Sequence, residues 1–522
     1  MRQNPGERST VAPFPLVAPG SGGANRTVEA WTDKPGRAVP LLIAAFVLFW
    51  TVYSAISRYN LDRHGDMVEN YAWGIAWQFG YFKHPPLFSW IAAAWFEVFP
   101  REEVFYHLLA STNVGVALVA LWRISRRFLD GNQQILLAAS AFFLPCLTFL
   151  AANYNATSAM LPFWALSVLF YLRMLERRRA VDAVLTGVLA GLAVLVKYHS
   201  AVIALALAAH MLLDRETRPL LASRLPWIAT AAGLATLAPH IVWLFRMDFA
   251  TLAYAADQGE GFVAAFVSAL SFVPVMVLYS LPAFGFLALF RRRGDGLPLV
   301  AIGQFRVLRD SVSGRAFGAA LVLPVVFTLL LALFTGGKLS SLWAIPFFAL
   351  LPVAIVLCLP KAAARRTPAL GLAALAVYCA ALLGIAPFVQ EATLDRARSY
   401  SAVPLPLIAR EAQEAWRERT GQPLAIVVGD AAAVVNAFSF YAADRPFAVQ
   451  EMSLQRTPWV TREMIAAEGA MAICDDMDPP CPEHALELLG RVDDTLALTV
   501  PATRGAGGPA VWSYTLYMRR PQ

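Results

Sequence analysis

Acidic and basic side chains gather in residues 58–100, directly after the first long apolar run of the chain. The ionisable residues of this stretch include Asp62, Asp66, Glu69, Glu97, His64, His84 and Lys83, together with Arg58 and Arg63. They alternate with many Trp, Phe and Tyr residues and are followed by a Pro-Pro pair. A membrane-spanning helix would not tolerate so much charge, and a free loop would not need so many aromatic rings. We therefore expect an interfacial segment, with ring bodies in lipid and polar tips in water, whose carboxylates could act as general bases.

The elements that must hold this stretch in place are long apolar runs. Hydrophobic residues make up 58% of the 522 residues and charged residues 15%, and the mean hydropathy is +0.54. This composition predicts an all-α polytopic membrane protein. We expect about eleven spans, at residues 38–57, 104–122, 134–151, 156–174, 182–197, 199–213, 226–245, 263–290, 316–334, 342–360 and 367–388.

The positive charge of the chain follows the loops between these spans. The net charge of +7 could indicate nucleic-acid binding, but the arginines form short groups between apolar runs, which is typical of a topology signal. Alternate loops hold these groups, at residues 123–127, 173–179, 215–224, 291–315 and 361–366. We therefore place those loops and the N-terminus in the cytoplasm, and Asp66 and everything after about residue 388 outside. The few cations on the outer side need another role, and anion binding is the obvious one.

The two ends of the chain differ in composition from the middle. Residues 1–37 are rich in Pro, Gly and Ser, which predicts a disordered cytoplasmic tail before a membrane domain at 38–388. Residues 389–522 read as a small periplasmic α/β domain, with strands in AIVVG, PFAV, AMAICDD and VWSYTLYM. The turn at Gly429-Asp430 is interpreted as a structural connection and not as a nucleotide site.

The five cysteines do not form a metal-binding pattern. Cys146, Cys358 and Cys379 lie in apolar runs and are expected to be inert core residues. Cys474 and Cys481 share one polar segment, and they could close a disulfide if that segment faces an oxidising compartment.

The run at residues 66–87 resembles a known family. An acid at Asp66, followed by an aromatic-rich stretch and the ending GYFKHPPL, is similar to the first outer loop of dolichyl-phosphate-mannose protein mannosyltransferase-like enzymes. These are polytopic GT-C glycosyltransferases, a group that includes the lipid A aminoarabinose transferase, and the chain also resembles rhizobial lipopolysaccharide glycosyltransferases. The resemblance covers roughly residues 40–350.

The resemblance implies a reaction. It implies sugar transfer from a polyprenyl phosphate at the periplasmic face of the bacterial inner membrane, with Asp66 as the base and inversion at the anomeric carbon. The implied acceptor is lipid A, core oligosaccharide or another envelope glycan, and less often a protein. We expect no cofactor and no metal, because lysine and arginine can stabilise a monophosphate leaving group.

The resemblance also assigns binding residues. The residues expected to bind the donor phosphate are Lys83, Lys197, Arg246 and Lys338, and those expected to bind substrate are His84, Tyr198, Asn155 and Trp343. Glu69, one turn after Asp66, would raise the pKa of Asp66 by like charge or position the acceptor. Many relatives carry an acid where this chain has Asn155, which puts a transfer of their acceptor specificity in doubt.

Structural roles are the alternative for each of these residues. Asp66 could cap an interfacial helix, Lys83 and Lys197 could extend to head groups, and His84 is better explained as a buttress of its loop. Arg246, Lys338 and Trp343 could anchor span ends at the interface.

Other functions also stay open. A transporter or lipid flippase would carry charges at mid-span and would show internal repeats. The sequence shows no such repeat, and its charges lie at the ends of the spans. An O-antigen-ligase-like transferase with a diphosphate donor would not need the GYFKHPPL loop.

Overall fold

The structure is a computed structural model that describes residues 35–290, 302–358, 368–394, 402–501 and 511–522. Most of the expected tail therefore lies outside the described residues, as do the basic groups at 291–301 and 359–367. The helices up to residue 394 are α2 (Pro35–Ser57), α3 (Asp66–Gly74), α4 (Leu87–Phe96), α5 (Glu103–Ser125), α6 (Gly131–Ser140), α7 (Met160–Arg177), α8 (Ala180–Val196), α9 (Ala201–Leu213), α10 (Leu225–Arg246), α11 (Ala250–Asp257), α12 (Phe262–Ala288), α13 (Arg306–Arg309), α14 (Val312–Thr335), α15 (Leu351–Leu357) and α17 (Pro368–Leu394).

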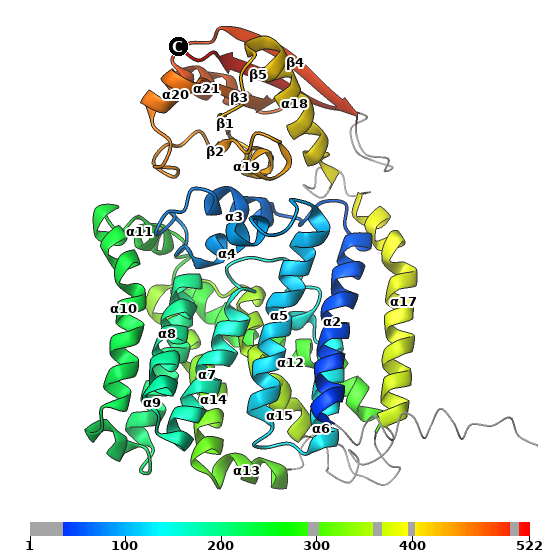
Figure 1. The fold of residues 1–522 in the computed structure, drawn as a ribbon, viewed down its shortest axis with the longest axis vertical. Helices are drawn as coiled ribbons and strands as arrows, with labels where there is room; N and C mark the ends of the chain where they lie inside the picture. The colour runs from blue at the N-terminus through cyan, green and yellow to red at the C-terminus, as the bar shows by residue number, and fades with distance from the viewer. Residues whose placement is uncertain (1–34, 291–301, 359–367, 395–401, 502–510) are drawn as a thin grey trace, which may run out of the picture.

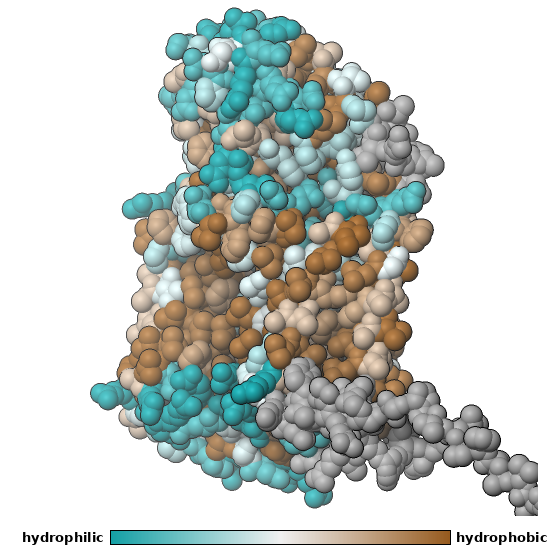
Figure 2. All heavy atoms as spheres, turned by 45° about the vertical axis from the view of Figure 1, so that its right-hand side comes forward, coloured by the Kyte–Doolittle hydropathy of each residue, from teal (hydrophilic) through white to brown (hydrophobic). Residues whose placement is uncertain are grey.

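The long helices run side by side and form a thick layer (Figure 1). Within the described residues, six of them are long and apolar enough to cross a membrane: α2, α5, α10, α12, α14 and most of α17. Figure 2 shows the corresponding apolar belt, bounded above and below by hydrophilic residues. Residues that face lipid must be apolar, so this belt identifies the part of the surface that a bilayer would cover.

Each of the eleven expected spans overlaps a helical segment, but two of them are not continuous helices. The 134–151 run is α6 followed by two short 3₁₀ turns, the second of which begins at Pro145. The 342–360 run begins as the 3₁₀ segment η6 (Ser341–Ala349), with Pro346 inside it, and continues as α15. Proline removes a backbone donor and clashes with the preceding turn, which accounts for both breaks.

The stretch with the ionisable residues folds as predicted for an interfacial segment. Helices α3 and α4 are short and lie across one end of the helical layer (Figure 1). Gly74 of α3 packs so closely on Ser89 of α4 that a Cβ there would lie 2.3 Å from the Ser89 carbonyl oxygen. The two helices therefore behave as one rigid platform.

Residues after 402 form a mixed sheet with helices. Its strands are β1 (Ile426–Gly429), β2 (Phe447–Gln450), β3 (Ala470–Asp475), β4 (Asp494–Pro501) and β5 (Val511–Arg519), in the order β2-β1-β3-β5-β4. The first three are parallel, and the last two pair antiparallel to their neighbours. Its helices are α18 (Leu405–Thr420), α19 (Ala432–Tyr441), α20 (Arg462–Glu468) and α21 (Cys481–Leu489). All four predicted strands are present, and β4 was missed. Cys474 and Cys481 form the expected disulfide, with a Cα–Cα distance of 5.5 Å.

Helix α19 rests directly on the α3 platform (Figure 1). Gly65, which precedes α3, has φ +80°, and a Cβ at this position would lie 2.4 Å from the Ala433 Cβ. Arg101, from the loop after α4, donates to the Phe440 and Ala442 carbonyl oxygens at 3.1 and 2.9 Å. These carbonyls lie at the C-terminal end of α19, where the helix itself supplies no donors. The sheet domain is thus fixed to the segment that carries Asp66.

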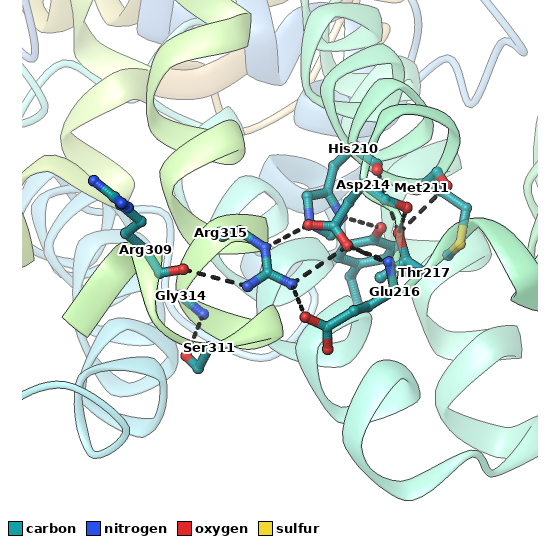
Figure 3. A network of polar contacts seen from close by, with 10 residues as sticks. His210, Met211, Asp214, Glu216, Thr217, Arg309, Ser311, Gly314 and Arg315 are labelled. Carbon is teal, nitrogen blue, oxygen red and sulfur yellow. Dashed lines mark hydrogen bonds and ion pairs between the residues drawn. The ribbon is translucent and has the colours of Figure 1, made fainter. Parts of the chain in front are cut away.

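The other end of the helical layer is held by ion pairs. Arg315 of α14 contacts Asp214 at 2.5 Å and Glu216 at 2.8 Å, and His210 lies beside Asp214 (Figure 3). Arg127 pairs with Glu176. The described members of the basic loop groups thus lie at the end of the layer opposite the sheet domain, as the alternation of charge predicted.

Candidate active site

Asp62 builds the turn that presents Asp66. Its carboxylate accepts hydrogen bonds from the backbone N–H groups of His64, Gly65, Asp66 and Met67, at 2.6 to 3.1 Å. The N–H groups of Asp66 and Met67 are first-turn donors of α3 that have no helical partner, and the N-cap residue Gly65 has no side chain to accept from them. Asp62 therefore caps this helix from the preceding turn. Because Asp62 fills this role, the Asp66 side chain is not needed as a cap. The sequence alone leaves capping open for Asp66 and does not reveal this role of Asp62.

A chain of hydrogen bonds connects Asp66 with Lys197. The Asn155 Nδ2 group donates to Asp66 Oδ2 at 3.0 Å. The other side of the amide is fixed, because Asn155 Oδ1 accepts from the backbone N–H groups of Thr157 and Ser158. Lys197 Nζ in turn donates to Thr157 Oγ1 at 2.9 Å. Residues 66, 155 and 197, from three distant parts of the chain, therefore form one polar cluster.

Lys197 carries a positive charge without an ion-pair partner among the described residues. It follows the last residue of α8 and precedes a 3₁₀ turn, Tyr198–Ser200, so it stands at the break between two apolar helices. Its ammonium lies 5.0 Å from the centre of the Trp343 ring, in cation–π geometry. Trp343 and Lys197 thus come together, as expected for two residues of one binding site.

Glu69 and Lys83 neutralise each other. The Lys83 Nζ to Glu69 Oε1 distance is 2.8 Å, with 24% and 14% of the two side chains exposed. Burial raises the pKa of Glu69, and the ammonium of Lys83 opposes this rise. Lys83 is therefore not the free phosphate-binding cation that we expected.

His84 closes the turn that begins at Tyr81 and contains Lys83. Its backbone exchanges hydrogen bonds with Tyr81, and its ring packs edge-on against Phe88 at 5.7 Å. Burial, followed by the charges of Lys197 and Lys83, holds the pKa of His84 well below 6.5. A neutral ring packed in this way agrees with the buttress interpretation.

Tyr198 contacts a histidine that the sequence analysis overlooked. The Tyr198 hydroxyl lies 2.7 Å from His240 Nε2, and His240 Nδ1 lies 2.6 Å from the Phe79 carbonyl oxygen. A carbonyl can only accept, so Nδ1 carries the proton and Tyr198 donates to Nε2. His240 lies six residues before Arg246 in an apolar run, and its neighbours in the sequence do not indicate which residue turns inward.

Arg246 and Lys338 are not brought into this cluster. Arg246 is exposed in the last turn of α10, and the described residues provide no hydrogen bond or ion pair for its side chain. Lys338 is exposed and pairs with Glu260 at 3.2 Å. Both positions agree better with the interface-anchor alternative than with donor binding.

A cavity of about 410 Å³ opens beside Asp66. One wall is apolar and aromatic, with side chains from α2, η6 and α17 and from the segment after α6; the residues are Trp50, Tyr53, Phe149, Leu150, Leu342, Ile345 and Val389. The polar wall is formed by Arg58, Asp62, Arg63, His64, Asp66, Asn153 and Asn155. Its size and mixed lining are typical of a site for a small molecule or for the head of a lipid.

The described residues contain one group with spacing that could suit a metal ion, formed by Asp430, Asp478 and Cys481. Cys481 is bonded to Cys474 and cannot act as a thiolate ligand. This group lies in the sheet domain and does not contribute to the cavity.

The arrangement suits proton transfer next to an anion. The second oxygen of Asp66, Oδ1, accepts no hydrogen bond from the described residues, so it is available to a ligand in the cavity. A carboxylate held in this way can accept a proton from a hydroxyl. Lys197, on the far side of Asn155 and Thr157, can stabilise negative charge on a second group.

Two sequence comparisons show which known proteins the chain is similar to. Residues 83–243 match the family model described as dolichyl-phosphate-mannose-protein mannosyltransferase. The chain is 24% identical over 222 residues to the lipid A galacturonosyltransferase RgtD of Rhizobium johnstonii, a match that covers 42% of this chain and 46% of RgtD. The match therefore spans less than half of the length of that relative.

The fold is similar to that of ArnT from Cupriavidus metallidurans. The crystal structure of ArnT bound to undecaprenyl phosphate superimposes with a TM-score of 0.58 at 14% identity, over 91% of this chain and 97% of ArnT. Apo ArnT gives a TM-score of 0.54 at 12% identity, over 92% and 97% of the two chains. The resemblance that the 66–87 run predicted is confirmed: the chain is a multi-pass membrane protein that resembles the GT-C glycosyltransferases in sequence and in fold.

Proposed function

We propose that the chain transfers a sugar from a polyprenyl-phosphate donor to a hydroxyl group of lipid A or another envelope glycan. The observation that carries this proposal is the position of Asp66, held by Asn155 between a half-apolar cavity and the unpaired cation of Lys197. The reaction takes place at the periplasmic face of the bacterial inner membrane, on the side of the helical layer that carries the sheet domain.

The reaction follows from these positions. The acceptor hydroxyl gives its proton to Asp66 Oδ1 while its oxygen forms a bond to the anomeric carbon. The bond from that carbon to the phosphate oxygen breaks, and the electron pair leaves with the polyprenyl phosphate. Lys197 faces the charge that develops on this leaving group. Attack and departure on opposite faces of the sugar invert the anomeric carbon.

Several observations support the donor and acceptor classes. RgtD is a lipid A galacturonosyltransferase, and ArnT was crystallised with undecaprenyl phosphate. A transporter would place its charges at mid-span. In this chain Asp66, Lys83 and Lys197 lie at the end of the helical layer next to the sheet domain. A protein acceptor, as the name of the family model would suggest, is the second outcome that the experiment must distinguish.

The test is transfer by the purified full-length protein in liposomes. Labelled polyprenyl-phosphate hexose and hexuronate are offered with lipid A or with a Ser/Thr-rich peptide, and the products are identified by mass spectrometry. We expect label on lipid A with an inverted anomeric centre. Label on the peptide alone would favour a protein acceptor, and a product of retained configuration would contradict the mechanism.

A further inference from the structure

The cavity beside Asp66 contains a second unpaired cation, Arg63. Among the described residues, no hydrogen bond or ion pair of the Arg63 side chain occurs, and the residue is exposed at the polar wall. Its neighbour His64 lines the same wall. Arg58 also lines it but is occupied, because its guanidinium donates to Leu61 O at 2.9 Å and to Asn153 Oδ1 at 2.7 Å, and to further carbonyls. Arg63 is therefore the guanidinium of this wall that is free to bind a ligand.

The segment η6 separates Arg63 from Lys197. Leu342 and Ile345, three residues apart in a 3₁₀ segment and hence on one face, line the cavity. Trp343, on another face, stacks with Lys197. Lys197 itself does not line the cavity. Arg63 thus lies in the cavity, whereas Lys197 lies outside its lining, connected to Asp66 through Thr157 and Asn155.

Building on the proposed function, we infer that Arg63 binds an anionic oxygen group, phosphate or carboxylate, on the acceptor glycolipid. Transfer has one leaving phosphate, and Lys197 accounts for it. The guanidinium of Arg63, which lines the cavity while Lys197 does not, is then free for a second anion. Guanidinium groups bind phosphate and carboxylate with two parallel hydrogen bonds, which would also fix the direction of the acceptor hydroxyl.

The lining of the cavity favours a lipid as the carrier of this anion. Trp50 and Tyr53 of α2 and Val389 of α17 form its apolar wall, and both helices are among those that can cross a membrane. An amphipathic glycolipid can place acyl carbons against this wall and its charged head at Arg63. A free sugar phosphate would leave the apolar wall without contact.

The test uses full-length protein in liposomes with two acceptors, bisphosphorylated lipid A and the same lipid after phosphatase treatment. Arg63→Gln should raise the acceptor KM about tenfold on phosphorylated lipid A, the loss typical of a hydrogen bond to a charged group at a partly exposed site. On the dephosphorylated lipid, the variant and the wild type should be equal, and the donor KM should not change. Arg410→Gln removes an exposed arginine of the sheet domain that pairs with Glu411, and it serves as the matched control.

Two results would overturn the inference. One is that Arg63→Gln raises the acceptor KM equally for both lipids. The other is that Arg63→Gln slows transfer from a hexuronate donor but not from a neutral hexose donor, which would assign Arg63 to the donor carboxylate. Thermal stabilisation by each lipid, without donor, gives a readout that needs no turnover. Phosphorylated lipid A should stabilise the wild type more than Arg63→Gln, and equal stabilisation would contradict the inference. Absence of transfer by wild-type protein to either lipid would instead refute the proposed function.

Discussion

Asn155→Ala tests whether the Asn155 amide positions the catalytic carboxylate. The substitution removes the one side-chain donor to Asp66 in the described structure, a 3.0 Å contact whose amide is locked by two backbone N–H groups. A hydrogen bond to a charged group contributes about 1.5–3 kcal/mol. Asp66 is only partly buried, and water can replace the lost donor, so we take the lower end of this range. At 1.36 kcal/mol per factor of ten, kcat should fall about tenfold.

The assay is initial-rate transfer by the purified variant in liposomes, with both substrates varied. The donor KM should stay within about twofold, because Asn155 contacts the base and not the leaving phosphate. Asn113→Ala is the matched control, since Asn113 donates to the Ser158 carbonyl in the same loop without contacting Asp66. An equal loss of kcat in both variants would show that Asn155 acts by holding the loop, and the positioning role would be refuted.

Three further outcomes follow from the contacts. Glu69→Gln should lower kcat by less than about tenfold, and Asp66→Asn should lower it far more, because Glu69 forms an ion pair with Lys83. Equal losses of kcat would indicate that both acids take part in the proton transfer. The pKa of His84 lies well below 6.5, so the unfolded chain binds the proton at higher pH than the folded chain does, and the stability contributed by neutral His84 is full above pH 6.5 and falls as the pH drops. His84→Asn should therefore reduce the change of the thermal midpoint between pH 7 and pH 5. An unchanged pH dependence would contradict this assignment. Arg101→Ala should lower the thermal midpoint and expose the sheet domain to protease, since four carbonyls at and just after the C-terminal end of α19 lose this donor. Resistance equal to that of wild type would show that the domain docks without it.

Hydropathy and local motifs predicted much of the fold. Apolar runs near 20 residues located the helices because a bilayer fixes their length. The alternation of arginine groups separated the two ends of the layer, and strand patterns located four of the five strands. The missed strand β4 alternates half-exposed and exposed side chains for most of its length, so its apolar signal was weak. The breaks inside the 134–151 and 342–360 runs were not predicted, although each contains a proline that explains it.

The site itself was only partly predictable. The GYFKHPPL ending indicated the neighbourhood of Lys83, and the family resemblance indicated Lys197, because such patterns are local in sequence. The partner of each side chain depends on contacts across long separations, such as the 89 residues between Asp66 and Asn155. Charge type alone could not show that Lys83 is neutralised, that Arg246 points outward, or that Asp62 fills the role of cap.

The most direct test of the central claim is single-turnover sugar transfer by Asp66→Asn with donor already bound. General base catalysis contributes about 10²- to 10⁴-fold, so we expect at least a hundredfold slower transfer with unchanged donor binding and an unchanged thermal midpoint. Transfer within tenfold of wild type, by correctly inserted protein, would contradict the role of Asp66 as the base.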